Sequence, residues 1–423
     1  MKKIIVVGGG AAGLMAAIRA AENGAQVILF EKMPRVGRKL GITGKGRCNL
    51  TNIADAAEIV KNLPGNGKFL YSALKNFSSA DTVNFFENLG VKTKVERGGR
   101  IFPASDDTSE VIDALLRRLA ILNVEVKTNS PVTEILIEQK KIVGVMVNDK
   151  IFECDAVILA TGGASYPATG STGDGFKFAR QLGHTVTEIL PALVPLETEE
   201  DFVRDLQGLS LRNVRVKLLS DGVQVAEQFG EMLFTHFGVS GPIILTLSRQ
   251  VAKLLAQKHF VELEINLKPA LTPEQLDARI LRDFAKFKRK TIKNSLGDLL
   301  PAKLIPIVLD LSYLSEEKRV DEITQAERRR LIEILRGLPL TITRTRPIDE
   351  AIVTAGGISV KEIDPRTMQS RLIDGLFIVG EVADVDGFTG GFNLQAAWSM
   401  GNVAGIFAAK FEREEVKRFK ERQ

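Results

Sequence analysis

The sequence predicts an α/β fold, in which a parallel sheet with a β-meander is interrupted by an inserted small β-barrel plus helical domain. Three observations predict it. The chain opens with a strand, a glycine turn, a helix and a second strand. Short alternating strands and charged helices begin at Pro191, and buried strands that run into glycine turns return at Thr341. We expect one domain over 1–190 and 341–423, and an inserted domain over 191–340 whose helical part covers 271–337.

The opening element is a βα unit. Ile4 to Val7 are apolar and mostly β-branched, Gly8 to Gly13 form a turn, and small side chains from Ala11 to Asn23 predict a helix that ends before Gly24. Gln26 to Phe30 then form a second buried strand. A strand, turn, helix and strand in this order are typical of a Rossmann-like fold.

The glycine spacing predicts a dinucleotide site. Gly8 makes the sharp turn, Gly10 lets a pyrophosphate approach the backbone, and Gly13 lets the helix lie close to the strand. Unpaired N–H groups and the macrodipole at the helix N-terminus favour the negative charge. Glu31, directly after the second strand, is placed to accept the two hydroxyls of an adenosine ribose. The same acid disfavours a cofactor of NADP type.

The amino-acid composition excludes several classes of protein. The 423 residues are 44% hydrophobic, carry a net charge of +5, and contain two cysteines and three histidines. No apolar run reaches the roughly 20 residues that cross a bilayer, so we expect a cytoplasmic protein without a membrane partner. The cysteines form no CxxC pair and the histidines have no ligand spacing, which predicts neither a disulfide framework nor a metal site. The oligomeric state stays open.

A polar loop from Gly37 to Asn52 contains four glycines and four basic residues. Such a loop offers N–H groups and cations to phosphates, and its length suits it to cover a flat ring system. Cys48 lies in this loop without a neighbouring histidine, which favours packing near the cofactor over a reactive thiol.

The next segment predicts scaffold and one further glycine turn. Helices are expected over Ser79–Leu89 and Thr108–Asn123, and a buried strand over Ala156–Leu159 runs into Ala160, Thr161, Gly162 and Gly163. The glycine-rich loop Ser165–Gly175 opens another helix but follows no strand directly, so we expect one nucleotide-binding core and no separate NAD(P)H domain. Short strands are expected at Val91–Val95, Arg100–Phe102 and, as a meander, at Glu125–Lys127, Val132–Glu138, Ile142–Val147 and Ile151–Cys154.

The insert predicts a barrel and then charged helices. Strands are expected over Val214–Leu219, Val223–Glu227 and Phe260–Leu267. A basic helix is expected from Arg279 to Lys293, but its apolar side chains recur at helical spacing, which favours an ordinary half-buried helix over a nucleic-acid contact.

The C-terminal segment resembles the opening one, because a buried strand is again followed by glycines, an acidic residue and a small-residue helix. Leu376 to Val379 form a last buried strand, Gly380 and Glu381 follow, and a small-residue helix is expected over Leu394–Ala409. An acid here accepts from ribityl hydroxyls, and the helix N-terminus stabilises negative charge on a reduced isoalloxazine. This second site favours FAD over NAD.

These motifs together resemble the two-dinucleotide-binding-motif flavoproteins and, within them, the BaiN-like (aminoacetone oxidase) family of bacterial FAD-dependent oxidoreductases. The similar segments span nearly the whole chain and are VVGGGAAG, GRKLGITGKGRCNLTN, RGGRIFPASD, ILATGGASYPATGSTGDG, GEMLFTHFGVSGP, TAGGIS and GEVADVDGFTGGFNLQAAWSMG. The resemblance implies a Rossmann-like FAD-binding domain that holds FAD non-covalently, an inserted barrel and helices, and a small-molecule substrate. TGDG also resembles fumarate-reductase-type flavoproteins, which transfer hydride to activated C=C bonds.

The predicted site has a cofactor part and a catalytic part. His236 and then Tyr166 are the candidates for general acid or base, and Arg47 or Arg346 for binding a substrate oxygen or an FAD phosphate. The predicted FAD-binding residues are Gly8, Gly10, Ala11, Ala12, Gly13, Glu31, Lys32, Arg38, Lys39, Thr43, Gly44, Gly46, Arg47, Cys48, Asn49, Val132, Ala160, Thr161, Gly162, Gly163, Gly380, Glu381, Asp386, Gly391, Phe392, Asn393 and Leu394.

Three functions stay open at this point. The first is a reductase of activated C=C bonds that uses NAD(P)H as a diffusible reductant. The second is an O₂-dependent oxidase of small amines resembling aminoacetone. The third, of a different class, is a flavoprotein that modifies or binds RNA, which the basic insert suggests but the helical spacing of its apolar residues disfavours.

Overall fold

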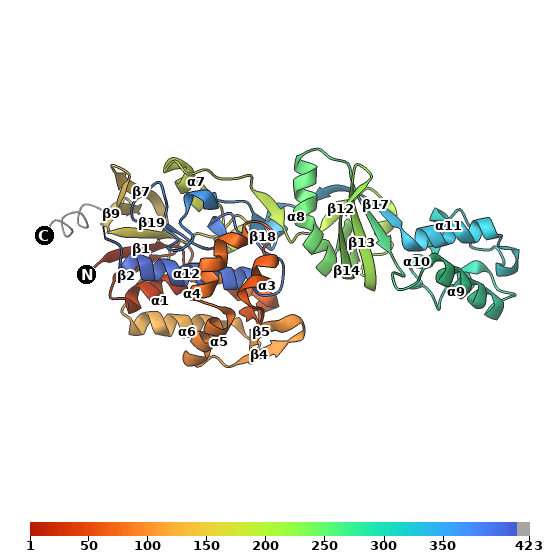
Figure 1. Cartoon of the computed structure of the whole chain (residues 1–423), viewed down its shortest axis with the longest axis horizontal. Helices are drawn as coiled ribbons and strands as arrows, with labels where there is room; N and C mark the ends of the chain where they lie inside the picture. The colour runs from red at the N-terminus through yellow and green to blue at the C-terminus, as the bar shows by residue number, and fades with distance from the viewer. Residues whose placement is uncertain (413–423) are drawn as a thin grey trace. The chain divides into compact units, whose positions relative to one another are not determined.

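The structure is a computed structural model that describes residues 1–412 and divides the chain into two compact units. Unit 1 comprises Met1–Leu190 and the chain from Ile352 onward, drawn from red to yellow and in blue in Figure 1. Unit 2 comprises Pro191–Ala351, drawn in green and cyan. The second boundary lies at residue 351 and not at the expected 340, because the strand Leu338–Thr345 (β17) pairs with barrel strands.

A five-stranded parallel sheet organises unit 1. Its order is β19-β10-β1-β2-β6, and each neighbouring pair is parallel. The strands β1, β2, β10 and β19 are mostly buried and apolar, as expected of a parallel sheet covered on both faces, whereas the edge strand β6 is more exposed and contains two charged residues. Because all five run the same way, their carboxyl ends meet at one edge. The bounds are β1 Lys3–Val7, β2 Gln26–Phe30, β6 Glu125–Lys127, β10 Ala156–Leu159 and β19 Leu376–Ile378.

Two helices from opposite ends of the chain lie side by side next to this sheet (Figure 1). They are α1 (Ala11–Glu22) and α12 (Phe392–Ala409). A Cβ atom added to Gly401 would come within 2.4 Å of the Ala12 carbonyl oxygen, and one added to Gly405 within 2.4 Å of the Ala16 carbonyl oxygen. Only glycine therefore allows the two backbones to approach this closely.

Smaller elements surround the sheet. One expectation was wrong, because β6 is the edge strand of the parallel sheet and does not belong to the meander. The meander itself is a separate antiparallel sheet of β7 (Val132–Glu138), β8 (Lys141–Val147) and β9 (Lys150–Glu153). The remaining elements include β3 Thr51–Asn52, α3 Ala56–Lys61, α4 Tyr71–Asn76, α5 Ser79–Asn88, β4 Thr93–Glu96, β5 Arg100–Pro103, α6 Thr108–Ile121 and α7 Asp174–Gln181.

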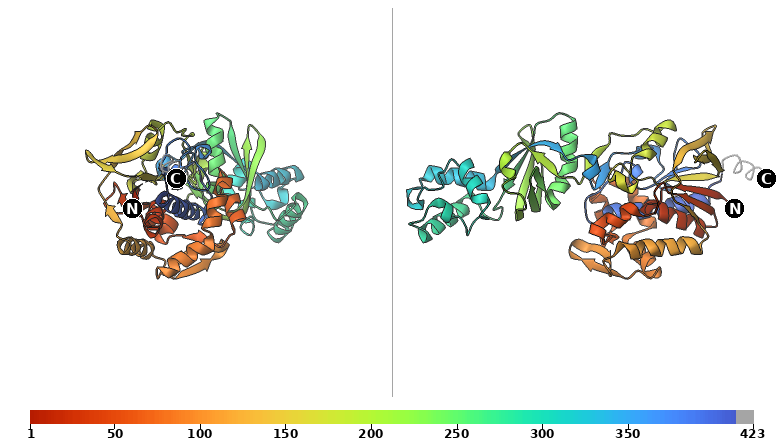
Figure 2. Two further views of the ribbon diagram at one scale, coloured as in Figure 1. Left: turned by 60° about the vertical axis from the view of Figure 1, so that its left-hand side comes forward. Right: turned by 180° about the vertical axis from the view of Figure 1, so that it is seen from behind.

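Unit 2 contains a closed six-stranded barrel with helices inserted in the chain before its last strand, β17, and Figure 2 shows it from two further directions. The strand order is β12-β15-β14-β13-β16-β17, and the interior is an apolar cluster of its own. The further bounds are β12 Leu196–Thr198, β13 Ser210–Ser220, β14 Val223–Thr235, β15 Gly238–Ser240, α8 Pro242–Ala256, β16 Val261–Asn266, α9 Pro273–Lys286, α10 Leu304–Leu311 and α11 Gln325–Arg336. A parallel sheet plus an inserted barrel and helices is the predicted fold class, which is confirmed.

Helix α9 (Pro273–Lys286) begins and ends earlier than the predicted basic helix, Arg279–Lys293. It ends at Lys286, whereas the apolar spacing predicted a helix to Lys293. Residues beyond it are held by a distant segment, because the Ile292 N–H donates to the Lys318 carbonyl at 2.8 Å and the Val320 N–H to the Lys290 carbonyl at 3.2 Å. Tertiary hydrogen bonds therefore replace the helical ones. Within residues 1–412, no helix combines the length and the apolar character needed to cross a membrane.

Candidate functional site

The candidate site lies at the carboxyl edge of the parallel sheet. The last residues of four strands are in register there, since Val7 pairs with Phe30 on one side and with Leu159 on the other, and Leu159 pairs with Ile378. Each of these strands is followed by a predicted site segment. The fold therefore brings together the turns after β1, β2, β10 and β19, although β1 ends at Val7 and β19 ends at Ile378.

The opening turn fits a bound pyrophosphate. Gly8 has a φ of +104°, and a Cβ added to Gly13 would come within 2.0 Å of the Gly8 carbonyl oxygen, so both glycines are needed for the turn and the helix contact. A Cβ added to Gly10, in contrast, would meet nothing within 4 Å. Open space above Gly10 is what close approach of a ligand to the backbone requires.

The N-terminus of α1 offers donors to an anion. Gly10 is its N-cap residue, no side chain caps the helix, and its first turn contains no acid. The first N–H groups of a helix have no partner within the helix, so those of Ala11, Ala12 and Gly13 are available to phosphate oxygens.

Glu31 lies at the end of β2 and is held by backbone donors. Its Oε2 accepts from the Gly9 N–H at 2.8 Å, and its Oε1 accepts from the Met33 N–H at 2.8 Å. A carboxylate has about four acceptor positions, so two remain for the hydroxyls of a ribose.

The loop after β2 has an unusual backbone. Gly44, Lys45, Gly46 and Cys48 all have positive φ values, and two of these four are not glycine. Such conformations persist only where surrounding contacts hold them, and they cluster at functional sites. Here the Thr108 hydroxyl donates to the Gly46 carbonyl at 2.6 Å.

Three basic residues connect this segment to the second glycine-rich loop. Lys32 Nζ lies 2.6 Å from Asp174 Oδ2, and Arg38 donates to the Ala168 carbonyl at 3.1 Å. Burial opposes ionisation of Asp174, but the Lys32 ammonium holds the pKa of that carboxyl below its usual value. Lys39 joins the network described next.

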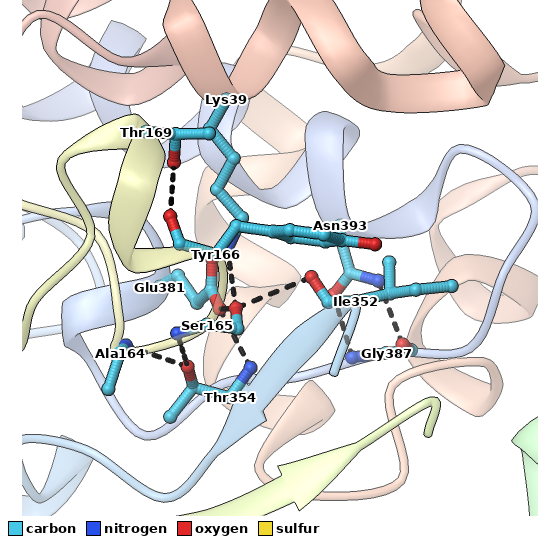
Figure 3. A network of polar contacts seen from close by, with 10 residues as sticks. All are labelled: Lys39, Ala164, Ser165, Tyr166, Thr169, Ile352, Thr354, Glu381, Gly387 and Asn393. Atoms are coloured by element: carbon cyan, nitrogen blue, oxygen red, sulfur yellow. Dashed lines mark hydrogen bonds and ion pairs between the residues drawn. The ribbon is translucent and has the colours of Figure 1, made fainter. Parts of the chain in front are cut away.

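A network of polar contacts centres on Glu381 (Figure 3). Its Oε2 lies 2.7 Å from Lys39 Nζ, and its Oε1 accepts from the Thr354 N–H at 2.7 Å and from the Ser165 hydroxyl at 3.1 Å. Lys39 also donates to Ser165 Oγ at 2.7 Å, and the Thr354 hydroxyl accepts from the N–H groups of Ala164 and Ser165. The network ties together four segments that are distant in sequence.

Ser165 and Thr354 were not among the predicted site residues. Both are buried, Ser165 completely. The only signal for them in the sequence was that each lies in a segment that carried the family resemblance. Their role depends on contacts that local sequence patterns do not specify.

The C-terminal motif has the same character as the opening one. Gly391, with a φ of +95°, is the N-cap of α12, which has no side-chain cap and no acid in its first turn. The Asn49 amide oxygen accepts from the Gly391 N–H at 2.9 Å, and the Asn393 amide bonds to the backbone of Gly387. Asp386, which directly precedes Gly387 in the sequence, is almost completely buried. The α12 N-terminus is therefore a second place that favours negative charge.

The turn after β10 is tightly packed. A Cβ added to Gly163 would come within 2.3 Å of the Thr354 hydroxyl, and Gly162 has a φ of +72°. The Thr161 hydroxyl is buried and has no hydrogen-bond partner among the residues that the structure describes. Ala160 is buried beside Gly8, and Val132 begins the first strand of the meander.

Arg47 is engaged by the protein's own acids. Its guanidinium pairs with Glu96 and Asp106 and lies 4.2 Å from the centroid of the Phe102 ring. Hydrogen bonds to Glu96 and then Asp106 raise its pKa. The arrangement fixes the polar loop on β4 and β5.

The two candidate acid–base residues lie in different units. Tyr166, in unit 1, has left-handed backbone angles (φ +53°, ψ +60°) and begins a short 3₁₀ turn. His236, in unit 2, is exposed in the turn between β14 and β15, with its ring 5.0 Å from that of Phe237. Arg346, also in unit 2, pairs with Glu197 and Glu350, which raises its pKa.

Three observations on unit 1 agree with the binding of FAD. The space above Gly10 is open, two helix N-termini are uncapped and free of acids, and Glu31 keeps acceptor capacity. Among the described residues, no group of three or more His, Cys, Asp or Glu side chains is arranged to hold a metal ion.

Comparison with known proteins now places the chain. The model of the HI0933-like protein Rossmann domain matches residues 2–407. The chain belongs to the HI0933-like family. It is 35% identical to a 3-dehydro-bile acid delta(4,6)-reductase from Clostridium scindens, over 97% of this chain and 100% of the relative. It is 30% identical to a ribosomal RNA dihydrouridine synthase from Haemophilus influenzae, over 95% of this chain and 97% of the relative.

Solved structures agree on the fold. A 3-ketosteroid delta1-dehydrogenase from Sterolibacterium denitrificans aligns with a TM-score of 0.55 at 14% identity, covering 97% of this chain and 100% of that chain. The family match and these relatives confirm the predicted BaiN-like resemblance and the enzyme class, an FAD-dependent oxidoreductase of this HI0933-like family.

We predict that Gly10→Ala weakens FAD binding without destabilising the fold. The added methyl group meets no protein atom but occupies the space through which a pyrophosphate approaches α1. We expect at least tenfold weaker FAD binding, about 1.4 kcal/mol, in a titration of deflavinated protein, and an unchanged urea midpoint. Gly13→Ala is the contrasting variant, and we expect it to lower the urea midpoint. Unchanged FAD affinity in Gly10→Ala contradicts the assignment.

We also predict that Cys48 is unreactive in the folded enzyme. Burial raises the pKa of its thiol to about 12, although a hydrogen bond with Thr43 opposes the shift. The folded state therefore keeps the thiol neutral, and the associated stability is complete below about pH 8.5, the ordinary thiol pKa, and is lost as the pH rises toward 12. Iodoacetamide labelling followed by peptide mapping should modify Cys48 only after unfolding. Rapid labelling of native protein refutes the packing role.

Proposed function

We propose that this HI0933-like protein reduces a C=C bond conjugated to a carbonyl group in a small organic substrate. The observation that carries the proposal is the full-length similarity, at 35% identity, to a reductase of 3-dehydro-bile acids. The second relative, a dihydrouridine synthase, supports the same chemistry, because dihydrouridine is uridine with the ring C=C bond beside its carbonyl saturated. A C=C bond conjugated to a carbonyl group accepts hydride at the carbon remote from the carbonyl, because the developing negative charge is then delocalised onto the carbonyl oxygen.

FAD, when bound, supplies the hydride. In this proposal the N-terminus of α1 binds the pyrophosphate, Glu31 accepts from the adenosine ribose, and the N-terminus of α12 stabilises negative charge on the reduced ring system. The Lys39–Glu381 network positions the loops that cover the cofactor.

The substrate also needs a proton at the carbon next to the carbonyl. We keep Tyr166 and His236 as the candidate donors. The left-handed backbone of Tyr166 supports the first, because strained residues gather at functional sites. The exposure of His236 gives it access to solvent protons. NAD(P)H is the proposed diffusible reductant, and the O₂-dependent oxidation of small amines stays an untested alternative.

A second candidate function is reduction of uridine in RNA. The specific observation in its favour is the 30% identity to the ribosomal RNA dihydrouridine synthase over nearly the whole of both chains. Small enones and uridine share the reacting group, so one site chemistry serves both candidates.

The test is anaerobic reoxidation of the reduced holoenzyme. We expect a steroid 4-en-3-one or a uridine-containing RNA to restore the visible flavin absorbance in step with loss of the substrate C=C bond. The matched control is the saturated ketone, which should leave the flavin reduced. If no conjugated substrate reoxidises the flavin, while air does so together with aminoacetone turnover and peroxide release, the proposal is wrong and the oxidase is favoured. NADH and NADPH are compared as reductants in the same cuvette.

A further inference from the structure

Positive charge is concentrated at one place in the helical part of unit 2. Residues 271–337 contain 14 Lys and Arg against 11 Asp and Glu. The stretch from Arg279 to Lys293 alone contains seven basic residues and one acid, so the rest of the helical part is net acidic. The excess is therefore local and not a general property of the surface.

The last residue of α9 and the segment after it carry most of this charge, and we name residues 286–293 the basic loop. Helix α9 ends at Lys286, and Lys288, Arg289 and Lys290 are exposed beyond it. A cation in the last turn of a helix is explained by the helix dipole, which accounts for Lys286 alone. The three that follow lie outside the helix and need another explanation.

The partners of these side chains divide them into two groups. Lys286 pairs with Asp298 at 2.7 Å, and Lys293 pairs with Glu316. Lys288, Arg289 and Lys290 make no ion pair with any residue from 1 to 412. Asp321, whose pKa is lowered chiefly by a hydrogen bond from Arg319, is also within electrostatic reach of Lys288. The three adjacent cations otherwise repel one another, so the loop favours an anionic ligand with several charges.

An aromatic ring and backbone bonds order the basic loop. The ammonium groups of Lys286 and Lys290 lie 4.8 and 4.9 Å from the centroid of the half-buried Phe287 ring. The Lys290 N–H donates to the Phe287 carbonyl at 2.8 Å, and residues 290–292 are bonded to residues 318–320. The cations are thus presented on a fixed backbone.

We propose that the basic loop is a docking surface for the phosphate backbone of a structured RNA, with Lys288, Arg289 and Lys290 as its phosphate contacts. The inference rests on the second candidate function, reduction of uridine in RNA. Closely spaced, unpaired cations match a polyphosphate backbone. The Phe287 ring is half-buried and lies against two ammonium groups. A segment that inserts into an anionic membrane needs exposed apolar side chains, so this arrangement favours RNA over a membrane.

The experiment measures binding of the full-length holoenzyme to a fluorescein-labelled RNA stem-loop with uridines in its loop. In the variant Lys288→Gln/Arg289→Gln/Lys290→Gln, loss of three phosphate contacts at about 0.7 each should reduce the slope of log affinity against log salt by about 2. Affinity at about 0.1 M salt should fall at least tenfold. The charge-conserving variant Lys288→Arg/Arg289→Lys/Lys290→Arg should bind as the wild type does.

The matched control removes the same charge elsewhere in unit 2. Arg212, Lys253 and Lys258 are exposed and lie outside the basic loop. We expect Arg212→Gln/Lys253→Gln/Lys258→Gln to leave RNA affinity within about twofold of the wild type and to keep the salt slope, since none of the three contacts a phosphate. Reoxidation of the reduced flavin by a small enone should be unchanged in all variants, which shows that they are folded.

Two results overturn the proposal. One is equal loss of RNA affinity in the basic-loop and control variants, or no loss in either. The other is binding to phosphatidylserine vesicles that depends on the basic loop while the RNA is not bound. If RNA binding depends on the basic loop but no enone or uridine is reduced, the docking surface stands and the proposed function fails.

Discussion

Direct contact between the backbones of α1 and α12 is the constraint on which the rest of unit 1 depends. Gly401 and Gly405 place α12 against the carbonyl oxygens of Ala12 and Ala16, at distances that any Cβ atom would prevent. The contact brings the first and last motifs of the chain to one edge of the parallel sheet. Both helices are uncapped at their N-termini, so the fold concentrates unpaired N–H groups and positive dipole ends in one region.

Polar contacts then fix the loops above that edge. Glu381 and Lys39 are separated by most of the chain, yet they form a short ion pair that also includes Ser165 and the backbone of Thr354. Both charged side chains are partly buried, and burial makes an ion pair stabilising only if its remaining hydrogen bonds are satisfied. The hydroxyl of Ser165 and the N–H of Thr354 satisfy them. The proposed reductase chemistry needs a cofactor held in a defined position, and this network supplies a rigid frame for it.

The sequence predicted the elements whose information is local. The strand Gln26–Phe30 has the predicted bounds, and the turn from Gly8 to Gly13 leads into the predicted helix. Elements defined by distant partners were missed or misplaced. Strand Glu125–Lys127 is too short to indicate its neighbour, and helix α9 ends early because residues 318–320 compete for its backbone groups. The candidate site shows the same division, since its glycine motifs can be recognised in the sequence and the contacts of Ser165 and Thr354 cannot.

The most direct test of the account is a comparison of FAD with FMN as ligands of the deflavinated protein. The account assigns the pyrophosphate to α1 and the adenosine ribose to Glu31, and FMN lacks both groups. Fluorescence titration should give one FAD per chain and an affinity for FMN at least about a hundredfold weaker, or about 2.8 kcal/mol. Equal affinities for FAD and FMN, or binding of neither, would contradict the assignment of the N-terminal motif and with it the central claim.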